Sequence, residues 1–218
     1  MSEAMPTVFI VDDDASLRVA LKRLLDARGY PCLAFDSAEA FLSRHAPALP
    51  GCLLLDVSMP GLDGLALQRK LLELGRALPI VFLTGHGDIP MTVRALKAGA
   101  VDFLTKPVAA VTLFAAVDAA LALDARARQA AADGQALQQR VESLTPRERE
   151  VLQGLAAGRL NKQIATDLGI VEQTVKFHRS RIMERMQART VAELMHLVAR
   201  LQLDAGDMAA DRPSASGP

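Results

Sequence analysis

The sequence predicts an α/β domain built on a five-stranded parallel sheet, followed by a small domain made only of helices. Within residues 1–123, five short apolar runs alternate with amphipathic helical segments, and successive strand–helix units build a parallel sheet with helices on both faces. Within residues 144–203, only the helical spacing of apolar residues is found. At 218 residues, half of them hydrophobic, the chain is long enough for two domains with buried cores.

The five apolar runs of the first domain have the length and composition of strands. They are residues 7–11, 31–35, 52–55, 79–84 and 101–106. Helices are expected between the runs, because capping residues precede the helical patterns and glycines follow them. The residues that mark helix boundaries are Gly29, Ser37, Asp63, Gly99 and Ala109, the last of which begins the fifth helix.

Polar side chains stand at the carboxyl ends of the first, third, fourth and fifth runs. In chain order they are Asp12 and Asp13, Asp56, Thr84, and Lys106. These strand ends share one edge of a parallel sheet, so three carboxylates meet there and need a cation to neutralise their repulsion. Oxygen ligands suit Mg²⁺, while the lysine and the hydroxyl suit phosphoryl oxygens. The arrangement predicts phosphoryl transfer to a carboxylate, although Asp56 taken alone is equally consistent with a turn cap.

The order and spacing of these residues form a motif. Asp-Asp follows the first strand, Asp-x-x-Met-Pro-x-x-x-Gly runs from Asp56 to Gly64, a threonine ends the fourth strand and Lys106-Pro107 follows the fifth. Residues 6–123 therefore resemble the receiver domain of a bacterial two-component response regulator. The resemblance implies a flavodoxin-like fold with strand order 2-1-3-4-5, a cis peptide bond between Lys106 and Pro107, and Asp56 as the phosphoacceptor.

The same resemblance implies a magnesium site. Asp13 is implied as the direct ligand. Asp12, the phosphoacceptor Asp56 and the backbone carbonyl of Ser58 are implied to complete the site. Mg²⁺ is the one cofactor that the resemblance implies.

Thr84 and Phe103 are implied to act as a switch pair. A phosphoryl group adds up to about two negative charges and three acceptor oxygens. Thr84 would move to hydrogen-bond it, and the ring of Phe103 would turn into the vacated space. The alternative is that Phe103 is an ordinary core residue, because it alternates with Val101 as strand residues do. His86, in the loop after Thr84, is expected to shape the surface rather than bind a metal.

Residues 124–143 are expected to form a linker that is partly helical. Apolar residues keep helical spacing within Ala109–Ala132, Asp133-Gly134 is expected to stop the helix, and residues 135–143 are mostly polar. The linker is either a solvated tether or a semi-rigid helical spacer, and the spacer is favoured for Ala109–Ala132 only.

The second domain is predicted to hold four helices in a helix-turn-helix arrangement. Thr145-Pro146-Arg147-Glu148 has the residues of a helix start: a cap, a proline at the first position and a glutamate at the third. Gly158 is expected to end this helix, Asn161 to cap a short second helix, and Gly169 to make the tight turn after it. The third and fourth helices are expected at residues 172–186 and 191–203.

The third of these helices should have one buried face and one exposed face. The buried face carries Val175, Ile182 and Met186. The outward face carries Lys176, Phe177, Ser180, Arg181 and Glu184. An outward phenylalanine beside basic residues is unusual for a solvated surface, and it suits contact with thymine methyl groups or sugars in the major groove of DNA. The alternative is that Phe177 contacts a neighbouring helix.

The second domain carries a further set of motif residues. They are Leu144 to Glu148, Gly158, Asn161-Lys162, Ile164-Ala165, Leu168, Thr174 to Lys176, and His178. With them, residues 144–203 are similar to the four-helix DNA-binding domain of the LuxR/NarL family. The resemblance implies that bases are read by Lys176, Phe177 and Ser180. It implies that phosphates are contacted by Lys162, Thr174, His178, Arg179 and Arg181. Val171 stands where the family usually has Ser or Thr, so the third helix lacks the expected side-chain cap.

The charge is unevenly divided, although the formal net charge is zero. Residues 1–123 carry eleven Lys/Arg and thirteen Asp/Glu, a net charge of −2, whereas residues 144–203 carry ten Lys/Arg and six Asp/Glu, a net charge of +4. A basic second domain suits the binding of a polyanion such as a nucleic acid. The sequence shows neither a membrane-spanning run nor a signal peptide, and Cys32 and Cys52 are expected to be free, buried thiols in the cytoplasm. Residues 204–218 are expected to form a disordered tail.

These features predict a phosphorylation-activated transcriptional regulator rather than an enzyme. A sensor histidine kinase would phosphorylate Asp56, phosphorylated copies would pair as homodimers, and two recognition helices would bind promoter DNA, with RNA polymerase as a further partner. The runner-up is an Asp-nucleophile phosphatase of the haloacid dehalogenase type, which needs an acid two residues after the nucleophile, where this chain has Ser58. A flavin-binding flavodoxin is a third alternative, but the phosphate-binding loop after the first strand is absent from the sequence.

Overall fold

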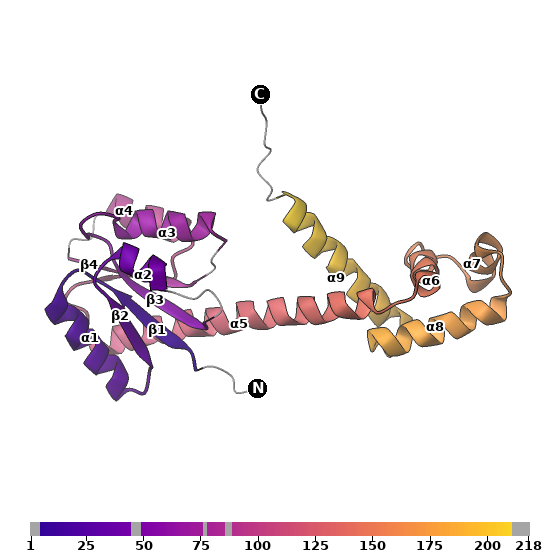
Figure 1. Ribbon diagram of the computed structural model, residues 1–218, viewed down its shortest axis with the longest axis horizontal. Coiled ribbons are helices and arrows are strands. Elements are labelled where there is room, and N and C mark those ends of the chain that lie inside the picture. Colours follow the sequence, from indigo (N-terminus) through magenta and orange to yellow (C-terminus); the bar gives the residue numbers. More distant parts are fainter. Residues whose placement is uncertain (1–4, 45–48, 76–77, 86–88, 211–218) are drawn as a thin grey trace, which may run out of the picture. The chain divides into compact units, whose positions relative to one another are not determined.

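The computed structural model describes residues 5–44, 49–75, 78–85 and 89–210 (Figure 1). The chain divides into two compact units, Met1–Arg128 and Gln129–Pro218, and each is treated separately below. Within the described residues, every helix is either too short or too polar to cross a membrane.

The first unit is built on a five-stranded parallel sheet with the order β2-β1-β3-β4-β5. The strands are β1 (Thr7–Val11), β2 (Cys32–Phe35), β3 (Gly51–Asp56), β4 (Ile80–Thr84) and β5 (Asp102–Thr105). The predicted strands and their order are confirmed. The central strand β3 is buried along its whole length, which explains why its sequence is a continuous apolar run rather than an alternating one.

Helices cover both faces of this sheet (Figure 1). They are α1 (Ala15–Ala27), α2 (Ala38–Arg44), α3 (Gly64–Glu73), α4 (Ile89–Lys97) and the first part of α5 (Ala110–Glu142). The side chains of Asp14 and Asp63 cap α1 and α3 by accepting backbone N–H groups of the first turn. Ser37 accepts the N–H of Ala40 at the start of α2, as the sequence predicts.

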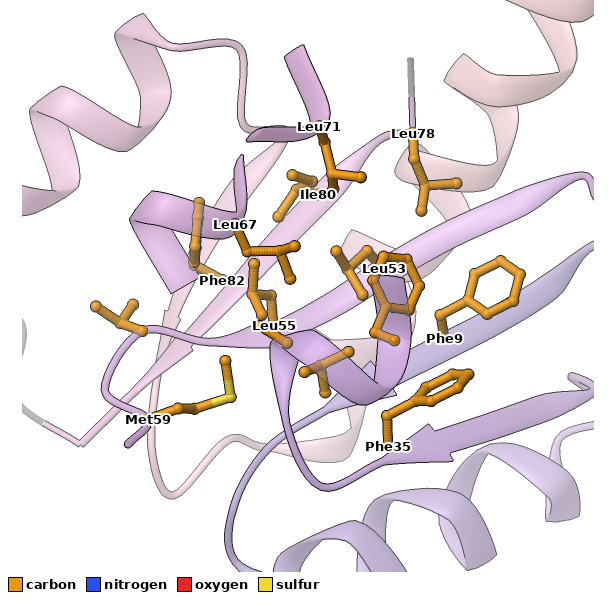
Figure 2. Packing of buried hydrophobic residues seen from close by; sticks show 14 of the residues in the cluster. Phe9, Phe35, Leu53, Leu55, Met59, Leu67, Leu71, Leu78, Ile80 and Phe82 are labelled. Atoms are coloured by element: carbon orange, nitrogen blue, oxygen red, sulfur yellow. The ribbon is translucent and has the colours of Figure 1, made fainter. Parts of the chain in front are cut away.

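Alternate residues of each strand enter two separate cores. On one face, Phe9 of β1, Leu55 of β3 and Phe82 of β4 pack with Leu67 and Leu71 of α3, as Figure 2 shows. On the other face, the intervening residues of the same strands pack against α1 and α5. Both cysteines belong to this second core and are free and buried, as predicted.

The helix α5 is longer than the sequence predicts. Asp133-Gly134 was expected to stop it, yet the helix runs without interruption to Glu142. A glycine costs about 1 kcal/mol in a helix interior, which neighbouring residues can offset. Here the Gln129 side chain donates to the Asp133 carboxylate one turn on (2.8 Å), and Leu137 is buried in the core of the second unit. Residues 135–143 were expected to form a polar tether beyond the end of the helix. This expectation is wrong for residues 135–142, which are helical.

In the part of the second unit that the structure describes, four helices follow the end of α5. They are α6 (Pro146–Ala156), α7 (Asn161–Leu168), α8 (Glu172–Met186) and α9 (Val191–Ala210). The turn between α7 and α8 is made by Gly169 with a φ of 65°, which is a conformation that suits glycine. Helix α8 begins after Val171, whose side chain makes no capping hydrogen bond, as predicted.

Two boundaries in this unit correct the sequence prediction. Asn161 is the first residue of α7 rather than its cap, because the side chain of Gln163 accepts the N–H of Leu160 and supplies the cap instead. Helix α9 continues to Ala210, so residues 204–210 are helical and not part of a disordered tail. Its Ala-containing sequence carries the helix past the predicted end at Leu203. Residues 211–218 lie outside the described residues.

The start of α6 is held by a reciprocal pair of hydrogen bonds. Glu148 accepts the N–H of Thr145 at 2.8 Å, and Thr145 accepts the N–H of Glu148 at 3.2 Å. Glu148 is buried, and burial alone would raise its pKa. The bonds to Thr145 and the positive charge of Arg185 outweigh burial and lower the pKa of Glu148 below its usual value.

Replacing Glu148 with Gln is expected to destabilise the second unit by about 1 kcal/mol at neutral pH. A lowered folded-state pKa contributes stability above the unfolded pKa of about 4.3 and loses it as the pH falls through the folded value. The difference between wild type and variant should therefore shrink in acid, measured by urea unfolding followed by circular dichroism. Glu150→Gln, at an exposed position of the same helix, is the control, and equal effects of the two substitutions would contradict the prediction.

Candidate phosphoacceptor and DNA-binding sites

The parallel sheet brings the predicted polar residues of the first unit to one edge. Asp12 follows β1, Asp56 and Thr84 are the last residues of β3 and β4, and Lys106 follows β5. The N–H of Lys106 donates to the carbonyl of Thr84 at 2.7 Å, which ties the two neighbouring strand ends together. Residues from four strands thus meet at one place because all four strands point the same way.

Three carboxylates lie together at this edge. One oxygen from each of Asp12, Asp13 and Asp56 lies within 4.8 Å of the others. The Lys106 ammonium lies 2.7 Å from Asp12 and 3.0 Å from Asp56. Three carboxylates and one ammonium leave two formal negative charges, which is the charge that a bound divalent cation would balance. The oxygen donor set and its charge therefore fit Mg²⁺.

Burial and charge act in opposite directions on these groups. Asp12 is fully buried and Asp56 is nearly so. Burial raises the pKa of Asp56 above its usual value, although Lys106 opposes the change. Burial alone would lower the pKa of Lys106, but hydrogen bonds to Asp12 and Asp56 outweigh burial and raise it. The lysine is therefore held in its charged form beside the carboxylates.

The backbone around the carboxylates also orients them. The N–H of Asp14 donates to Asp12 at 2.8 Å, and the N–H of Ser58 donates to Asp56 at 3.3 Å. The guanidinium of Arg18 donates to the carbonyl of Asp12 at 2.6 Å. Asp13 remains exposed, so it is the carboxylate of the three that faces solvent. The carboxylate cluster is thus hydrogen-bonded on its buried side and exposed to solvent on the side of Asp13.

Thr84 and Phe103, the predicted switch pair, lie on the neighbouring strands β4 and β5. Thr84 is buried at 2% exposure, whereas Phe103 is half-buried. The ring of Phe103 packs against the core that contains Phe82, with the ring centroids 5.9 Å apart. The peptide bond between Lys106 and Pro107 is cis, as the resemblance implies. His86 lies outside the described residues.

The second unit presents the predicted outward face of α8. Val175, Ile182 and Met186 are fully buried in the core, as expected. On the opposite face, all five residues predicted to point outward are exposed: Lys176, Phe177, Ser180, Arg181 and Glu184. Phe177 is 57% exposed, and its ring lies beside His178 and under the Arg181 guanidinium, 5.6 Å from the ring centroid. Both of these partners of the Phe177 ring, His178 and Arg181, belong to α8 itself.

The residues predicted to contact phosphates differ in accessibility. Lys162 on α7 and Arg181 on α8 are exposed. Thr174, His178 and Arg179 are half-buried. The Arg179 guanidinium donates to the side chain of Asn161 at 2.9 Å, which links α8 to the start of α7. Within the described residues, Nδ1 of His178 is buried and makes no hydrogen bond.

A hollow of about 480 Å³ is lined by residues from the starts of α7 and α8, among others. Three of its lining residues are basic: Arg159, Lys162 and Arg179. Glu172 also lines it and pairs with Lys176 at 3.1 Å. The basic side chains from two helices give this side of the unit the charge that phosphates require.

Comparison with known proteins assigns both halves to families. Residues 8–118 match the family described as "Response regulator receiver domain", and residues 142–198 match "Bacterial regulatory proteins, luxR family". The chain is a response regulator with a LuxR-type DNA-binding domain. Members of this class are phosphorylation-dependent transcriptional regulators, and this chain is one of them. The comparisons give the phosphatase alternative no support.

Full-length relatives agree with this assignment. Nodulation protein W of Bradyrhizobium diazoefficiens is 45% identical over 91% of this chain and 87% of its own length. Response regulator protein TmoT of Ectopseudomonas mendocina is 44% identical over 93% of this chain and 92% of its own length. The solved structure of response regulator StyR is similar with a TM-score of 0.82 and 49% identity, covering 90% of this chain and all of that one.

The structure shows contacts of three residues that the sequence prediction did not single out: Arg18, Asp124 and Arg159. Nothing in the sequence marks Arg18 or Arg159 as part of a site, because single arginines are common on the surfaces of helices and loops. Asp124 is different, because its position in the sequence could have marked it. It falls at the helical spacing of the buried residues Leu113, Val117 and Ala120, where an apolar residue is expected.

Proposed function

We propose that residues 1–123 act as the receiver of this response regulator and that residues 144–203 bind promoter DNA. A sensor histidine kinase would donate the phosphoryl group to Asp56. The observation that best supports this is the cluster of Asp12, Asp13 and Asp56 with Lys106, whose net charge of two negative units suits a divalent cation.

Asp12, Asp13, Asp56 and the backbone carbonyl of Ser58 would hold Mg²⁺. When bound, Mg²⁺ would neutralise charge and orient the oxygens of the incoming phosphoryl group. A carboxylate oxygen of Asp56 would attack the phosphorus as the bond to the histidine nitrogen of the kinase breaks. Lys106 would hold a phosphoryl oxygen through its charged ammonium, and the hydroxyl of Thr84 would hydrogen-bond another.

The movement of Thr84 toward the phosphoryl group would free space for the ring of Phe103. Phe103 lies on β5 and Thr84 ends the neighbouring strand β4, and the helix α4, which packs against β5, exposes the apolar side chains of Val93 and Leu96. Receivers would pair through this face, because an apolar patch on a soluble domain favours contact with a partner. Phosphorylation would thus promote a homodimer.

In the dimer, two copies of α8 would enter the major groove about one helical turn apart. Lys176, Phe177 and Ser180 would read bases. Phosphates would be contacted by Lys162, Thr174, His178, Arg179 and Arg181. The chain would work in the cytoplasm with RNA polymerase as a partner, and would act as a regulator rather than as an enzyme.

The proposal is tested by adding beryllofluoride, a phosphoryl mimic, with Mg²⁺ to the full-length chain. Sizing is expected to change from monomer to dimer, and affinity for a selected DNA duplex should rise about tenfold or more, within the usual range for coupled sites. Asp56→Asn is the control and should respond in neither assay. If beryllofluoride leaves size and affinity of the wild type unchanged, phosphorylation does not control DNA binding.

A further inference from the structure

Asp124 is a buried acid on the helix that joins the two domains. It is 3% exposed and continues the buried stripe of α5 formed by Leu113, Val117 and Ala120. An apolar residue at this position would extend the stripe, and replacing a buried ion pair with apolar residues is often neutral or stabilising. Burial of apolar surface therefore gives no reason for an aspartate here. What an aspartate adds is directed hydrogen bonds.

Those hydrogen bonds tie α5 to the entry of β3. The carboxylate of Asp124 accepts the N–H of Gly51 at 2.9 Å and the Nε–H of Arg128 at 2.8 Å. The guanidinium of Arg128 also donates to the carbonyl of Leu49 at 2.6 Å. We call Leu49, Gly51, Asp124 and Arg128 the β3-entry clamp. Gly51 begins the strand that ends at Asp56, so the clamp connects α5 to the strand of the phosphoacceptor.

The backbone at the clamp lies directly against β1. A Cβ at Gly51 would lie 1.9 Å from the carbonyl of Thr7, so only glycine fits between the two strands there. The sheet holds the backbone there, because Gly51 pairs with Thr7 and the N–H of Thr7 donates to the carbonyl of Pro50 at 2.9 Å. This makes the clamp a rigid attachment rather than a contact with a mobile loop.

Beyond the clamp, α5 has little support from other elements. None of residues 129–136 is buried, whereas Leu137 belongs to the core of the second unit. With 1.5 Å per residue, this leaves about 12 Å of helix between the two attachments. Without the clamp, the last packed residues on the receiver side would be Ala120 and Leu121, and the free stretch would be about twice as long.

We propose that Asp124 and Arg128 are positioning residues for phosphorylation-dependent DNA binding. By holding α5 to the entry of β3, they shorten the stretch of α5 that packs against neither domain. When two receivers pair, the two attached DNA-binding domains are then more tightly constrained. A longer or looser connection lowers the effective concentration of the second domain at its half-site. This inference rests on the proposed function.

The test compares two double variants of the full-length chain. Asp124→Ala/Arg128→Ala removes the clamp. Gln129→Ala/Asp133→Ala is the matched control, because it removes an exposed side-chain hydrogen bond with the same spacing on the same helix. Affinity for a DNA duplex, selected from random sequences by the beryllofluoride-treated wild type, is measured with and without beryllofluoride. Labelling of Asp56 by acetyl phosphate is measured in parallel.

The clamp variant is expected to label normally and to lose about fivefold or more of the affinity gain caused by beryllofluoride, while the control keeps the gain. A folding defect lowers the active fraction in both arms and leaves this ratio unchanged. If the double variant does not fold, Arg128→Ala decides, because the Arg128 side chain is 36% exposed whereas that of Asp124 is 4% exposed, so truncating Arg128 disturbs less buried structure. An unchanged gain in a clamp variant that labels normally, or a loss of labelling itself, overturns the inference. The absence of any gain in the wild type instead overturns the proposed function.

Discussion

Replacing Asp56 with Asn is expected to abolish labelling of the protein by acetyl phosphate in the presence of Mg²⁺. The amide has nearly the same size as the carboxylate, but it is not a nucleophile and removes one negative charge from the cluster. Lys106 would keep its 2.7 Å contact with Asp12, so the pocket should remain folded. The measurement is the mass of the intact protein after incubation with acetyl phosphate.

Asp63→Asn is the matched control for this substitution. Asp63 is an exposed aspartate seven positions further on, where its carboxylate caps α3 and Asn is also a good cap. It should label like the wild type. Persistent labelling of the Asp56 variant would show that another group accepts the phosphoryl group.

Replacing Lys176 with Ala is expected to weaken specific DNA binding by about 1–3 kcal/mol, which is about 5–150-fold in affinity. Lys176 is exposed on α8, and its only ion pair in the described part of the chain is with Glu172, an exposed contact of small energy. Its ammonium is therefore accessible to a base edge. The measurement is a binding titration at several salt concentrations with specific and unrelated duplexes.

Lys162→Ala provides the contrast. As a phosphate contact, Lys162 should affect specific and unrelated DNA equally, and its loss should lower the slope of log affinity against log salt by about one. Lys176→Ala should instead reduce the preference for the specific duplex. If the Lys176 variant binds both duplexes as the wild type does, Lys176 does not read bases.

Much of the first domain was predictable because its signals are local and repeated. Each buried strand is a short apolar run, and the alternation of strands with helices leaves few arrangements other than a parallel sheet. The start of α6 was equally clear, because Thr145 and Glu148 stand at the spacing of a capping box and the structure contains both bonds. These predictions succeeded where residue type and spacing alone specify the local geometry.

The errors lie where distant contacts outweigh a local signal. Asp133-Gly134 reads as a helix stop, but the burial of Leu137 in the second unit holds the helix beyond it. Asn161 reads as a cap, but its side chain accepts a hydrogen bond from Arg179, eighteen residues away, and Gln163 supplies the cap. A single sequence does not reveal which of two good cap candidates is used.

The sequence by itself determined the family and the types of residue at the phosphoacceptor edge, because these depend on motifs and on periodicity along the chain. The order of the strands came from the resemblance to the family. Tertiary structure alone decided the pairing of Lys106 with both Asp12 and Asp56, whether the outward Phe177 stays exposed or is covered by a neighbouring helix, and the attachment of Asp124 to Gly51. Each of these depends on the distance between groups that are far apart in the chain or on what covers a side chain. Only packing sets such distances, because the hydrophobic effect that drives it is non-directional and leaves the final contacts to shape and hydrogen bonding.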